Sequence, residues 1–281
     1  AIFIEMAKSL INTFFFAILL LSLSACKPKK QAYSFFVAGH VYGQPARKMP
    51  GLHPPFVRDF DYIRQYPKIR RGIFTGDIVY YSRPAFWDSV DTQIKQLGLP
   101  VHFAVGNHDE GHKSPYKDRY GITYYHFEEE GDLFLILNPG LGGWNIWKEQ
   151  MSYLKKTLKK AHRYDNIFVF FHQVLWWEPD NEYRHIRFNS TDGRAPKINF
   201  WPEVIPLFKA TGRPVYFFAG DVAASPQKTA FFQEQHDEQI QFIASGMGTG
   251  VEDNYVLVRV DKEKKVYLEV RYFNKDKKQR L

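Results

Sequence analysis

The sequence of 281 residues has a single cysteine, so no disulfide can form within the chain. It also lacks a dense stripe of lysine and arginine, and its net charge of +8 comes from 38 basic against 30 acidic residues. This modest excess favours anionic small molecules or lipid headgroups and does not indicate specific nucleic-acid binding. No Gly-x-Ser-x-Gly motif occurs, which excludes the nucleophile elbow of a serine hydrolase. The 44% of hydrophobic and 24% of charged residues exclude a disordered tail, a collagen repeat and a coiled coil.

The longest apolar run, from Ile11 to Leu23, lies near the start of the sequence and follows Lys8. It is shorter than the about 20 apolar residues that a membrane-spanning helix needs. The small residues Ser24 and Ala25 follow it and directly precede Cys26. A basic start, a short apolar core and small residues before a cleavage site predict a secretory signal peptide over residues 1–25. The alternative is a buried N-terminal helix with a chance cysteine.

The tetrapeptide Leu-Ser-Ala-Cys that ends at Cys26 resembles the lipobox of bacterial lipoproteins. The resemblance implies that Cys26 carries lipid and becomes the first residue of the mature chain. We therefore expect an exported protein, anchored through Cys26 to a bacterial membrane and exposed to the periplasm or the cell surface. Lys27 is not the acidic residue that resembles an inner-membrane retention signal, which favours the outer membrane. Residues 26–32 are predicted to form a polar tether whose lysines lie near anionic headgroups.

From residue 33 to residue 281, short apolar runs alternate with amphipathic stretches, the pattern of one α/β domain. The most apolar runs predict buried strands at Tyr33–Val37, Gly72–Thr75, Val101–Val105, Asn166–Phe171 and Val215–Ala219. Helical spacing occurs at Ala85–Leu97 and Trp147–Ala161. Further strands are predicted at Tyr124–Phe127, Leu133–Leu137, Gln239–Ala244, Tyr255–Val260 and Val266–Tyr272, the last two as a hairpin.

Each of the five buried strands is followed by a polar residue that can bind a metal ion or transfer a proton. These residues are His40, Asp77, the run Asn107-His108-Asp109, His172 and Asp221. Because ligands bind at the carboxyl ends of the strands in open α/β sheets, we expect these side chains to share one rim. Singly, each has an ordinary explanation, such as a helix cap or a buried core histidine. Five such residues in succession favour a shared site.

Gly76-Asp77, the run from Gly106 to Asp109 and His172 resemble the motifs of the calcineurin-like metallophosphoesterases. The similarity extends through nearly the whole domain. It implies an α/β fold in which two β-sheets form a sandwich flanked by helices, in α/β/β/α layers. It also implies divalent metal ions at the strand ends and hydrolysis of a phosphomonoester or phosphodiester.

The resemblance gives each motif residue a role. Asp77 corresponds to the carboxylate that bridges two metals, and Asn107 and His172 correspond to ligands of the second metal. His108 corresponds to the residue that stabilises or protonates the leaving oxygen, and Asp109 to the residue that holds it in place.

Two motifs depart from the family pattern. Where the family has Asp-x-His, this sequence has Ala38-Gly39-His40, so the first carboxylate is missing. Where the family has Gly-His-x-His, this sequence reads Gly220-Asp221-Val222-Ala223. Both losses fall largely on the first metal, so that His40 either bonds the phosphate, holds a weak second ion or packs in the core.

The second metal site would keep Asp77, Asn107 and His172, with Asp221 in place of a histidine. Three oxygen ligands and one imidazole favour Mn, Fe, Mg or Ca over Zn. We therefore predict one firmly bound divalent ion and a first site that is weak or empty.

The segment from Trp176 to Trp201 is long and rich in tryptophan and arginine. The sequence suggests that it binds a phosphorylated small molecule or envelope component through Trp176, Trp177, Arg184, Arg187 and Arg194. An ordinary surface excursion with a hydrophobic anchor explains the same composition.

The missing ligands keep a second function open, a non-catalytic, lipid-anchored binding or assembly protein that retains the phosphoesterase fold. Against it, the run Asn107-His108-Asp109 is intact, and a binding protein has no need of a group at the leaving oxygen. The sequence therefore favours an enzyme and gives no indication of its oligomeric state.

Overall fold

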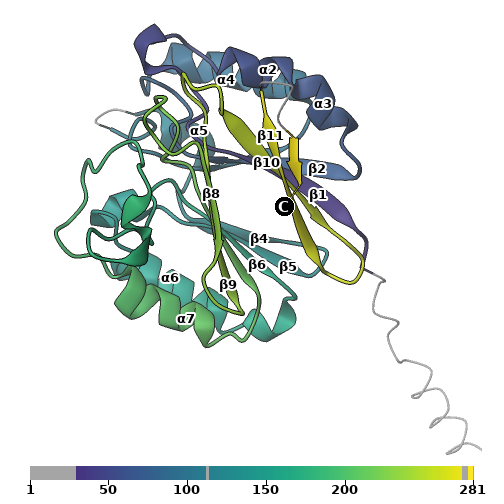
Figure 1. Ribbon diagram of the computed structural model, residues 1–281, viewed down its shortest axis with the longest axis vertical. Coiled ribbons are helices and arrows are strands. Elements are labelled where there is room, and N and C mark those ends of the chain that lie inside the picture. Colours follow the sequence, from purple (N-terminus) through teal and green to yellow (C-terminus); the bar gives the residue numbers. More distant parts are fainter. Residues whose placement is uncertain (1–29, 112–113, 274–277, 281) are drawn as a thin grey trace, which may run out of the picture. The chain divides into compact units, whose positions relative to one another are not determined.

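The apolar runs of the sequence form two mixed β-sheets that face each other (Figure 1). The computed structural model describes residues 30–111, 114–273 and 278–280, and these supply six strands to each sheet. The predicted signal peptide over residues 1–25 lies outside the described residues, as does Cys26. In the part of the chain that is described, no helix is long and apolar enough to cross a membrane.

The first sheet has the strand order β12-β11-β10-β1-β2-β3. Its strands are β1 (Tyr33–Ala38), β2 (Ile69–Thr75), β3 (Val101–Ala104), β10 (Asn254–Val260), β11 (Val266–Tyr272) and β12 (Lys278–Arg280). Strands β1, β2 and β3 run parallel, so their carboxyl ends share one edge. The predicted hairpin is confirmed by the antiparallel pairing of β10 with β11.

The second sheet has the strand order β4-β5-β6-β7-β9-β8. Its strands are β4 (Tyr125–Glu129), β5 (Asp132–Ile136), β6 (Ile167–Phe170), β7 (Val215–Ala219), β8 (Phe231–Gln235) and β9 (Ile240–Ser245). The four central strands β5, β6, β7 and β9 are parallel. Strand β8, which the sequence did not predict, is an edge strand that ends in three polar residues.

Helices cover the outer face of each sheet, which confirms the expected α/β/β/α layers (Figure 1). Over the first sheet lie α2 (Pro54–Arg58), α3 (Phe60–Gln65) and α4 (Pro84–Leu97). Over the second lie α6 (Lys148–Leu158) and α7 (Ile205–Lys209), and the short α5 spans Tyr116–Tyr120. The helix predicted up to Ala161 ends at Leu158, and a separate turn of 3-10 helix follows at Ala161–Arg163.

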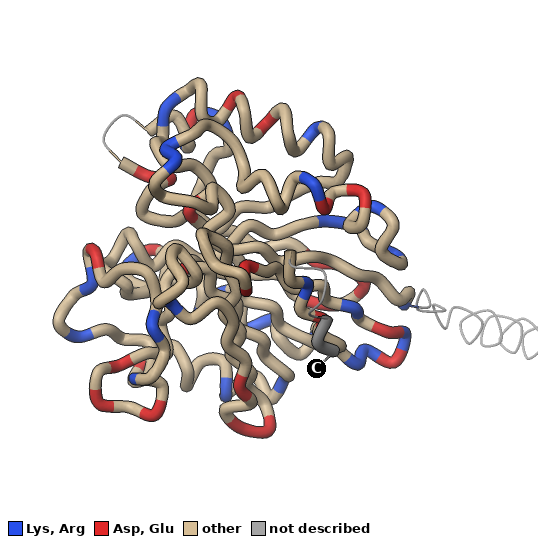
Figure 2. The backbone as a smooth tube through the Cα atoms, turned by 45° about the horizontal axis from the view of Figure 1, so that its top comes forward, with Lys and Arg blue, Asp and Glu red and all other residues tan. Residues whose placement is uncertain are grey.

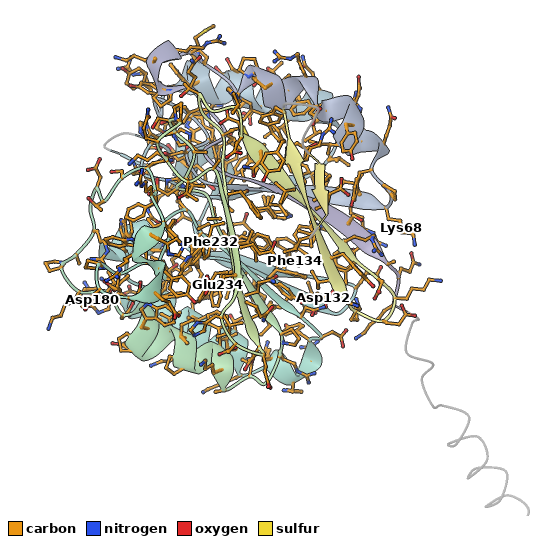
Figure 3. All side chains as sticks on the ribbon, viewed as in Figure 1. Lys68, Asp132, Phe134, Asp180, Phe232 and Glu234 are labelled. Carbon is orange, nitrogen blue, oxygen red and sulfur yellow. The ribbon has the colours of Figure 1, made fainter. Side chains whose placement is uncertain are left out.

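Aromatic rings fill the space between the two sheets. Phe35 of β1 packs edge-on against Phe134 of β5 and Phe168 of β6, with ring centroids 4.9 and 5.1 Å apart. Phe134 is fully buried and lies between the sheets, as Figure 3 shows. Because alternate residues of each strand face this layer, the strands hold their register and their carboxyl ends stay aligned.

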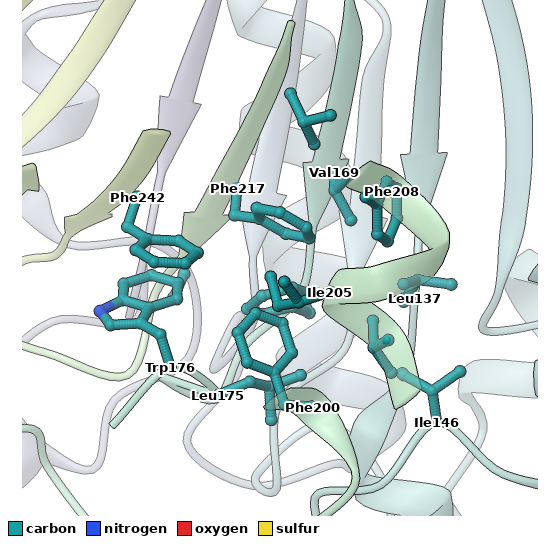
Figure 4. Packing of buried hydrophobic residues seen from close by; sticks show 14 of the residues in the cluster. Leu137, Ile146, Val169, Leu175, Trp176, Phe200, Ile205, Phe208, Phe217 and Phe242 are labelled. Atoms are coloured by element: carbon teal, nitrogen blue, oxygen red, sulfur yellow. The ribbon is translucent and has the colours of Figure 1, made fainter. Parts of the chain in front are cut away.

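A second layer of the core lies between the second sheet and its helices (Figure 4). Phe208 of α7 packs against Phe217 of β7 with ring centroids 4.9 Å apart. Trp176 lies flat against Phe242 of β9, at 4.9 Å and with 11° between the ring planes. Its side chain has 0% exposure, so the prediction that Trp176 binds substrate is wrong. Burial of this large apolar ring against the sheet is more favourable than its exposure to water in a cleft.

Charged residues of both signs are interspersed along the chain (Figure 2). A buried polar network lies at the amino end of β5, where Asp132 is labelled in Figure 3. Its carboxylate accepts hydrogen bonds from the Tyr33 hydroxyl at 2.7 Å and from the Asn166 backbone amide at 3.0 Å. Lys264 lies in the turn between β10 and β11, and its Nζ is 3.2 Å from Asp132 Oδ2. This network joins the two sheets at the edge opposite to the carboxyl ends of the parallel strands.

We predict that Phe134→Ala lowers the free energy of unfolding by about 3–5 kcal/mol, because it removes a fully buried ring and leaves a cavity between the sheets. Urea denaturation followed by circular dichroism measures the change. Ile122→Ala is the control, since Ile122 is 63% exposed and its loss should change stability by less than about 0.5 kcal/mol. Similar values for the two variants would contradict this description of the core.

Candidate metal centre

The carboxyl ends of β2, β6 and β7 bring three predicted ligands to one point. Asp77 follows β2, His172 follows β6 and Asp221 follows β7. Each offers one ligand atom within 4.8 Å of the other two, and all three side chains are buried. Two sheets therefore contribute to a single cluster at their shared edge.

The tautomer of His172 is fixed by its surroundings. Its Nδ1 lies 2.9 Å from the carbonyl oxygen of Thr75, which can only accept, so Nδ1 carries the hydrogen. In the neutral ring Nε2 then presents its lone pair 3.3 Å from Asp77 Oδ1 and 3.7 Å from Asp221 Oδ1. His172 Nε2 and Asp221 Oδ1 have no hydrogen-bond partner among the described residues. A lone pair and two carboxylate oxygens around one buried point require a positive charge there, either a proton or a metal ion.

The pKa values reflect the same requirement. Burial alone would lower the pKa of His172, but Asp77 and Asp221 outweigh it and raise that pKa to about 10. Burial raises the pKa of Asp221 to about 8. Burial would also raise the pKa of Asp77, yet the neighbouring imidazole of His172 holds it well below its usual range. In the absence of metal a proton on His172 meets the need for positive charge, and a divalent cation fits the same donor atoms.

Strained backbone positions these groups. His40, Asp77 and Ala223 have positive φ angles of 49°, 50° and 70°, which are rare for residues other than glycine. Gly106 permits a close approach of two loops, since a Cβ atom there would lie 2.3 Å from Asp77 Oδ1. Strain of this kind persists only where surrounding structure enforces it, and it often occurs at functional sites.

Asp109 connects the loops after β2 and β3. Its buried carboxylate accepts hydrogen bonds from the backbone amides of Ile78 at 2.7 Å, Val79 at 3.0 Å and Gly106 at 2.8 Å. The expected contact with the His108 ring is replaced, because His108 Nδ1 lies 2.8 Å from the carbonyl oxygen of Tyr80. Asp109 therefore holds the loop that carries His108 through the backbone amide of Gly106 and not through the His108 ring.

His108 lies directly beside Asp77. Its backbone amide donates to Asp77 Oδ1 at 3.2 Å, and its ring is partly exposed at the mouth of a pocket. Since the Tyr80 carbonyl can only accept, Nδ1 carries a hydrogen, and Nε2 is left without a partner in the described part of the chain.

Asn107 is placed differently from the buried cluster. Its side chain is exposed and lines a pocket of about 520 Å³, next to His108. It directly follows Gly106, whose backbone amide donates a hydrogen bond to Asp109. A ligand role for Asn107 stays a prediction.

His40 has both ring nitrogens occupied. Its Nδ1 lies 2.7 Å from the carbonyl oxygen of Met247 and therefore donates, while Nε2 lies 2.9 Å from the Tyr42 hydroxyl and accepts from it. Burial lowers the pKa of His40 to about 4, so the ring is neutral. Its Nε2 is 3.7 Å from Asp77 Oδ2. Of the three expectations for His40, this geometry favours a buried packing residue, because Tyr42 holds the nitrogen that a metal or phosphate would need.

Two of the four remaining predicted substrate residues, Trp177 and Arg194, contact other residues of their own segment. Trp177 packs against Phe188, with ring centroids 4.9 Å apart, and the Arg194 guanidinium lies 5.5 Å from the Trp177 ring. Arg194 also forms an ion pair with Glu178. These contacts stabilise the segment internally, and a substrate role for Trp177 and Arg194 stays a prediction.

Arg184 and Arg187 are exposed, and a substrate role for them stays a prediction.

Asn189, which the sequence analysis did not single out, fixes the loop that carries Asp221. Its backbone amide donates to the Asp221 carbonyl at 2.8 Å. Its side chain donates to the Val222 carbonyl at 3.1 Å and accepts from the Ala224 amide at 2.8 Å. Asn189 thus links the long segment to the loop of Asp221, and no spacing pattern in the sequence signals this contact.

Comparison with known proteins agrees with the geometry. The profile of the calcineurin-like phosphoesterases matches residues 40–225, which include Asp77, His172 and Asp221. The chain therefore belongs to the calcineurin-like phosphoesterase family, as the resemblance of its motifs predicted.

A solved structure shares the fold, and a second one matches more weakly. A purple acid phosphatase from yellow lupin seeds matches with a TM-score of 0.64 and 14% identity, over 89% of this chain and 53% of its own. A 5'-nucleotidase from Candida albicans matches with a TM-score of 0.48 and 14% identity, over 88% of this chain and 53% of its own. This chain thus spans about half the length of both proteins. A search of the curated proteins finds no match.

We predict that His172→Ala weakens Mn²⁺ binding by more than about a hundredfold, beyond the effect typical of residues that only orient a ligand. The reason is that the variant removes the single imidazole of the buried cluster. Isothermal titration calorimetry measures the affinity. His185→Ala is the matched control, because His185 is exposed and outside the cluster. Equal affinities of wild type and His172→Ala would show that this cluster does not bind the ion.

Proposed function

We propose that this protein hydrolyses phosphomonoesters or phosphodiesters with one divalent ion held by Asp77, His172 and Asp221. The observation that carries the proposal is the convergence of two buried carboxylates on the unpartnered Nε2 of His172. A divalent metal ion at such a point neutralises phosphoryl oxygens and makes a water molecule more acidic. The purple acid phosphatase with the same fold is named a phosphatase, which supports this class of reaction.

The protein's own groups hold this arrangement before any substrate binds. The Thr75 carbonyl orients His172, and Asp109 fastens the loop of Asp77 to the loop of His108. Because these contacts are buried, the ligand atoms need little reorganisation when charge develops on the substrate.

His108 is the group placed to act on the leaving oxygen. With Nδ1 bonded to the Tyr80 carbonyl, only Nε2 is available to a substrate. In the protonated ring, Nε2 donates its proton to the leaving oxygen as the bond to phosphorus breaks, and the neutral ring then retains the hydrogen on Nδ1.

A single ion is favoured by the residues around His40. Ala38 and Ala223 supply no ligand at the two degenerate motifs, and His40 is already bonded by Met247 and Tyr42. Two carboxylates and one imidazole form a harder ligand set than the sites that select Zn, and such a set favours Mn, Fe or Mg.

The proposed location rests on the sequence. The apolar run and Leu-Ser-Ala-Cys support export and attachment to a bacterial membrane through lipid on Cys26, with the outer membrane favoured. At that location the substrate would be a phosphorylated small molecule or envelope component.

The alternative is a non-catalytic binding or assembly protein. The observation in its favour is that two ligand positions hold alanine and that Tyr42 satisfies His40, so half of the family's metal site is filled by protein. Metal-dependent turnover separates the two functions.

We predict that removing divalent ions with EDTA abolishes hydrolysis of para-nitrophenyl phosphate or of its diester, and that Mn²⁺ restores it. The restoration should fail for Asp77→Asn, because this change removes a charged ligand of the buried cluster. Asp237→Asn serves as the control, since Asp237 lies outside the cluster. An absence of turnover with either ester under every divalent ion would favour the binding protein.

We predict that His108→Ala lowers kcat/KM by about a hundredfold to ten-thousandfold, and more for an alkyl phosphate than for para-nitrophenyl phosphate. A poor leaving group depends on proton donation, whereas nitrophenolate leaves without it. His162→Ala, which removes an exposed histidine, should leave both rates unchanged. An equal loss with both substrates would assign His108 a purely structural role.

A further inference from the structure

A pocket of about 520 Å³ opens next to His108. Its volume lies within the range of about 300–1,000 Å³ that is typical of small-molecule sites. One wall comes from Tyr80, Tyr81 and Arg83, in the loop that follows Asp77, and another from Asn107 and His108 after β3. His108 therefore contacts the candidate metal centre, through the hydrogen bond that its backbone amide donates to Asp77, and also lines this pocket.

The pocket presents aromatic rings in a fixed arrangement. Tyr80 and Tyr81 meet edge to face, with centroids 4.5 Å apart and 86° between the planes. Tyr80 also packs against Tyr42 at 5.4 Å and against His108 at 5.4 Å, so it is held from two sides. Tyr81 is 36% exposed. Rings held in this way offer a surface on which a flat, unsaturated group can stack.

Arg83 brings a positive charge to one wall of the pocket. Its guanidinium lies 4.8 Å from the centroid of the Tyr81 ring and forms no ion pair with the described residues. The carboxylate that lines the pocket, Glu110, accepts a hydrogen bond from the Asn138 side chain at 2.6 Å. An arginine stacked on a tyrosine ring is well placed to bind a carboxylate or phosphate.

We propose that this pocket binds the leaving group of the substrate, and that this group is a planar aromatic ring carrying a second anionic group. Tyr81 stacks against the ring and Arg83 pairs with the additional negative charge. The proposal rests on the proposed function, because His108 is taken to face the leaving oxygen.

The test uses phosphonates that cannot be hydrolysed, with Mn²⁺ present, and isothermal titration calorimetry as the readout. The ligands are methylphosphonate, benzylphosphonate and meta-carboxybenzylphosphonate. Benzylphosphonate should bind about threefold to tenfold more tightly than methylphosphonate through stacking. The carboxylate should add a further factor of about two to five, the range expected of an exposed ion pair.

Variants separate the two contributions. Arg83→Gln should abolish the advantage of the carboxylate and keep that of the ring. Tyr81→Leu, which keeps an apolar side chain at the position, should weaken both benzyl ligands and leave methylphosphonate unchanged. Arg58→Gln changes an exposed arginine on α2 and should have no effect.

Turnover of phenyl phosphate and meta-carboxyphenyl phosphate distinguishes failure of this inference from failure of the proposed function. Selective phosphonate binding without any turnover supports the pocket and overturns hydrolysis. Turnover with equal KM for both esters, together with equal phosphonate affinities, overturns the pocket and leaves hydrolysis standing. Failure of all three phosphonates to bind also overturns the inference.

Discussion

The contact between His172 Nδ1 and the Thr75 carbonyl fixes the geometry of the candidate metal centre. It joins the end of β6 in one sheet to the end of β2 in the other, at a distance of 2.9 Å. This contact fixes the hydrogen on Nδ1. Nε2 therefore faces Asp77 and Asp221 either with its lone pair or with a proton. The site is thus prepared for a cation by a backbone carbonyl, and the sandwich of two sheets holds that carbonyl in place.

Neighbouring residues form hydrogen bonds with the two motifs that depart from the family pattern. Tyr42 and Met247 satisfy both nitrogens of His40, and Asn189 secures the loop of Asp221 where the family places histidines. These contacts fill the space around His40 with packed protein. The buried cluster of Asp77, His172 and Asp221 remains, with the backbone amide of His108 bonded to Asp77.

The sequence predicted most of the strands and the buried cluster because both depend on local patterns. An apolar run of strand length followed by a polar residue places Asp77, His172 and Asp221 at one edge once the strands are parallel. The partners of His40, the hydrogen bonds that backbone amides donate to Asp109 and the burial of Trp176 depend on segments far apart in sequence. No local pattern in the sequence predicts them. His40 and Met247, for example, are 207 positions apart. Asn107 shows the same limit, since its exposure depends on how the loop after β3 turns.

Anomalous diffraction from crystals grown in excess Mn²⁺ tests the central claim most directly, because it counts ions and locates each one. A single peak within about 2.3 Å of His172 Nε2 and of one oxygen each from Asp77 and Asp221 is the expected result. Two peaks bridged by Asp77, with one beside His40, would contradict it. So would a map in which the His172 ring keeps its place and no peak lies near Nε2.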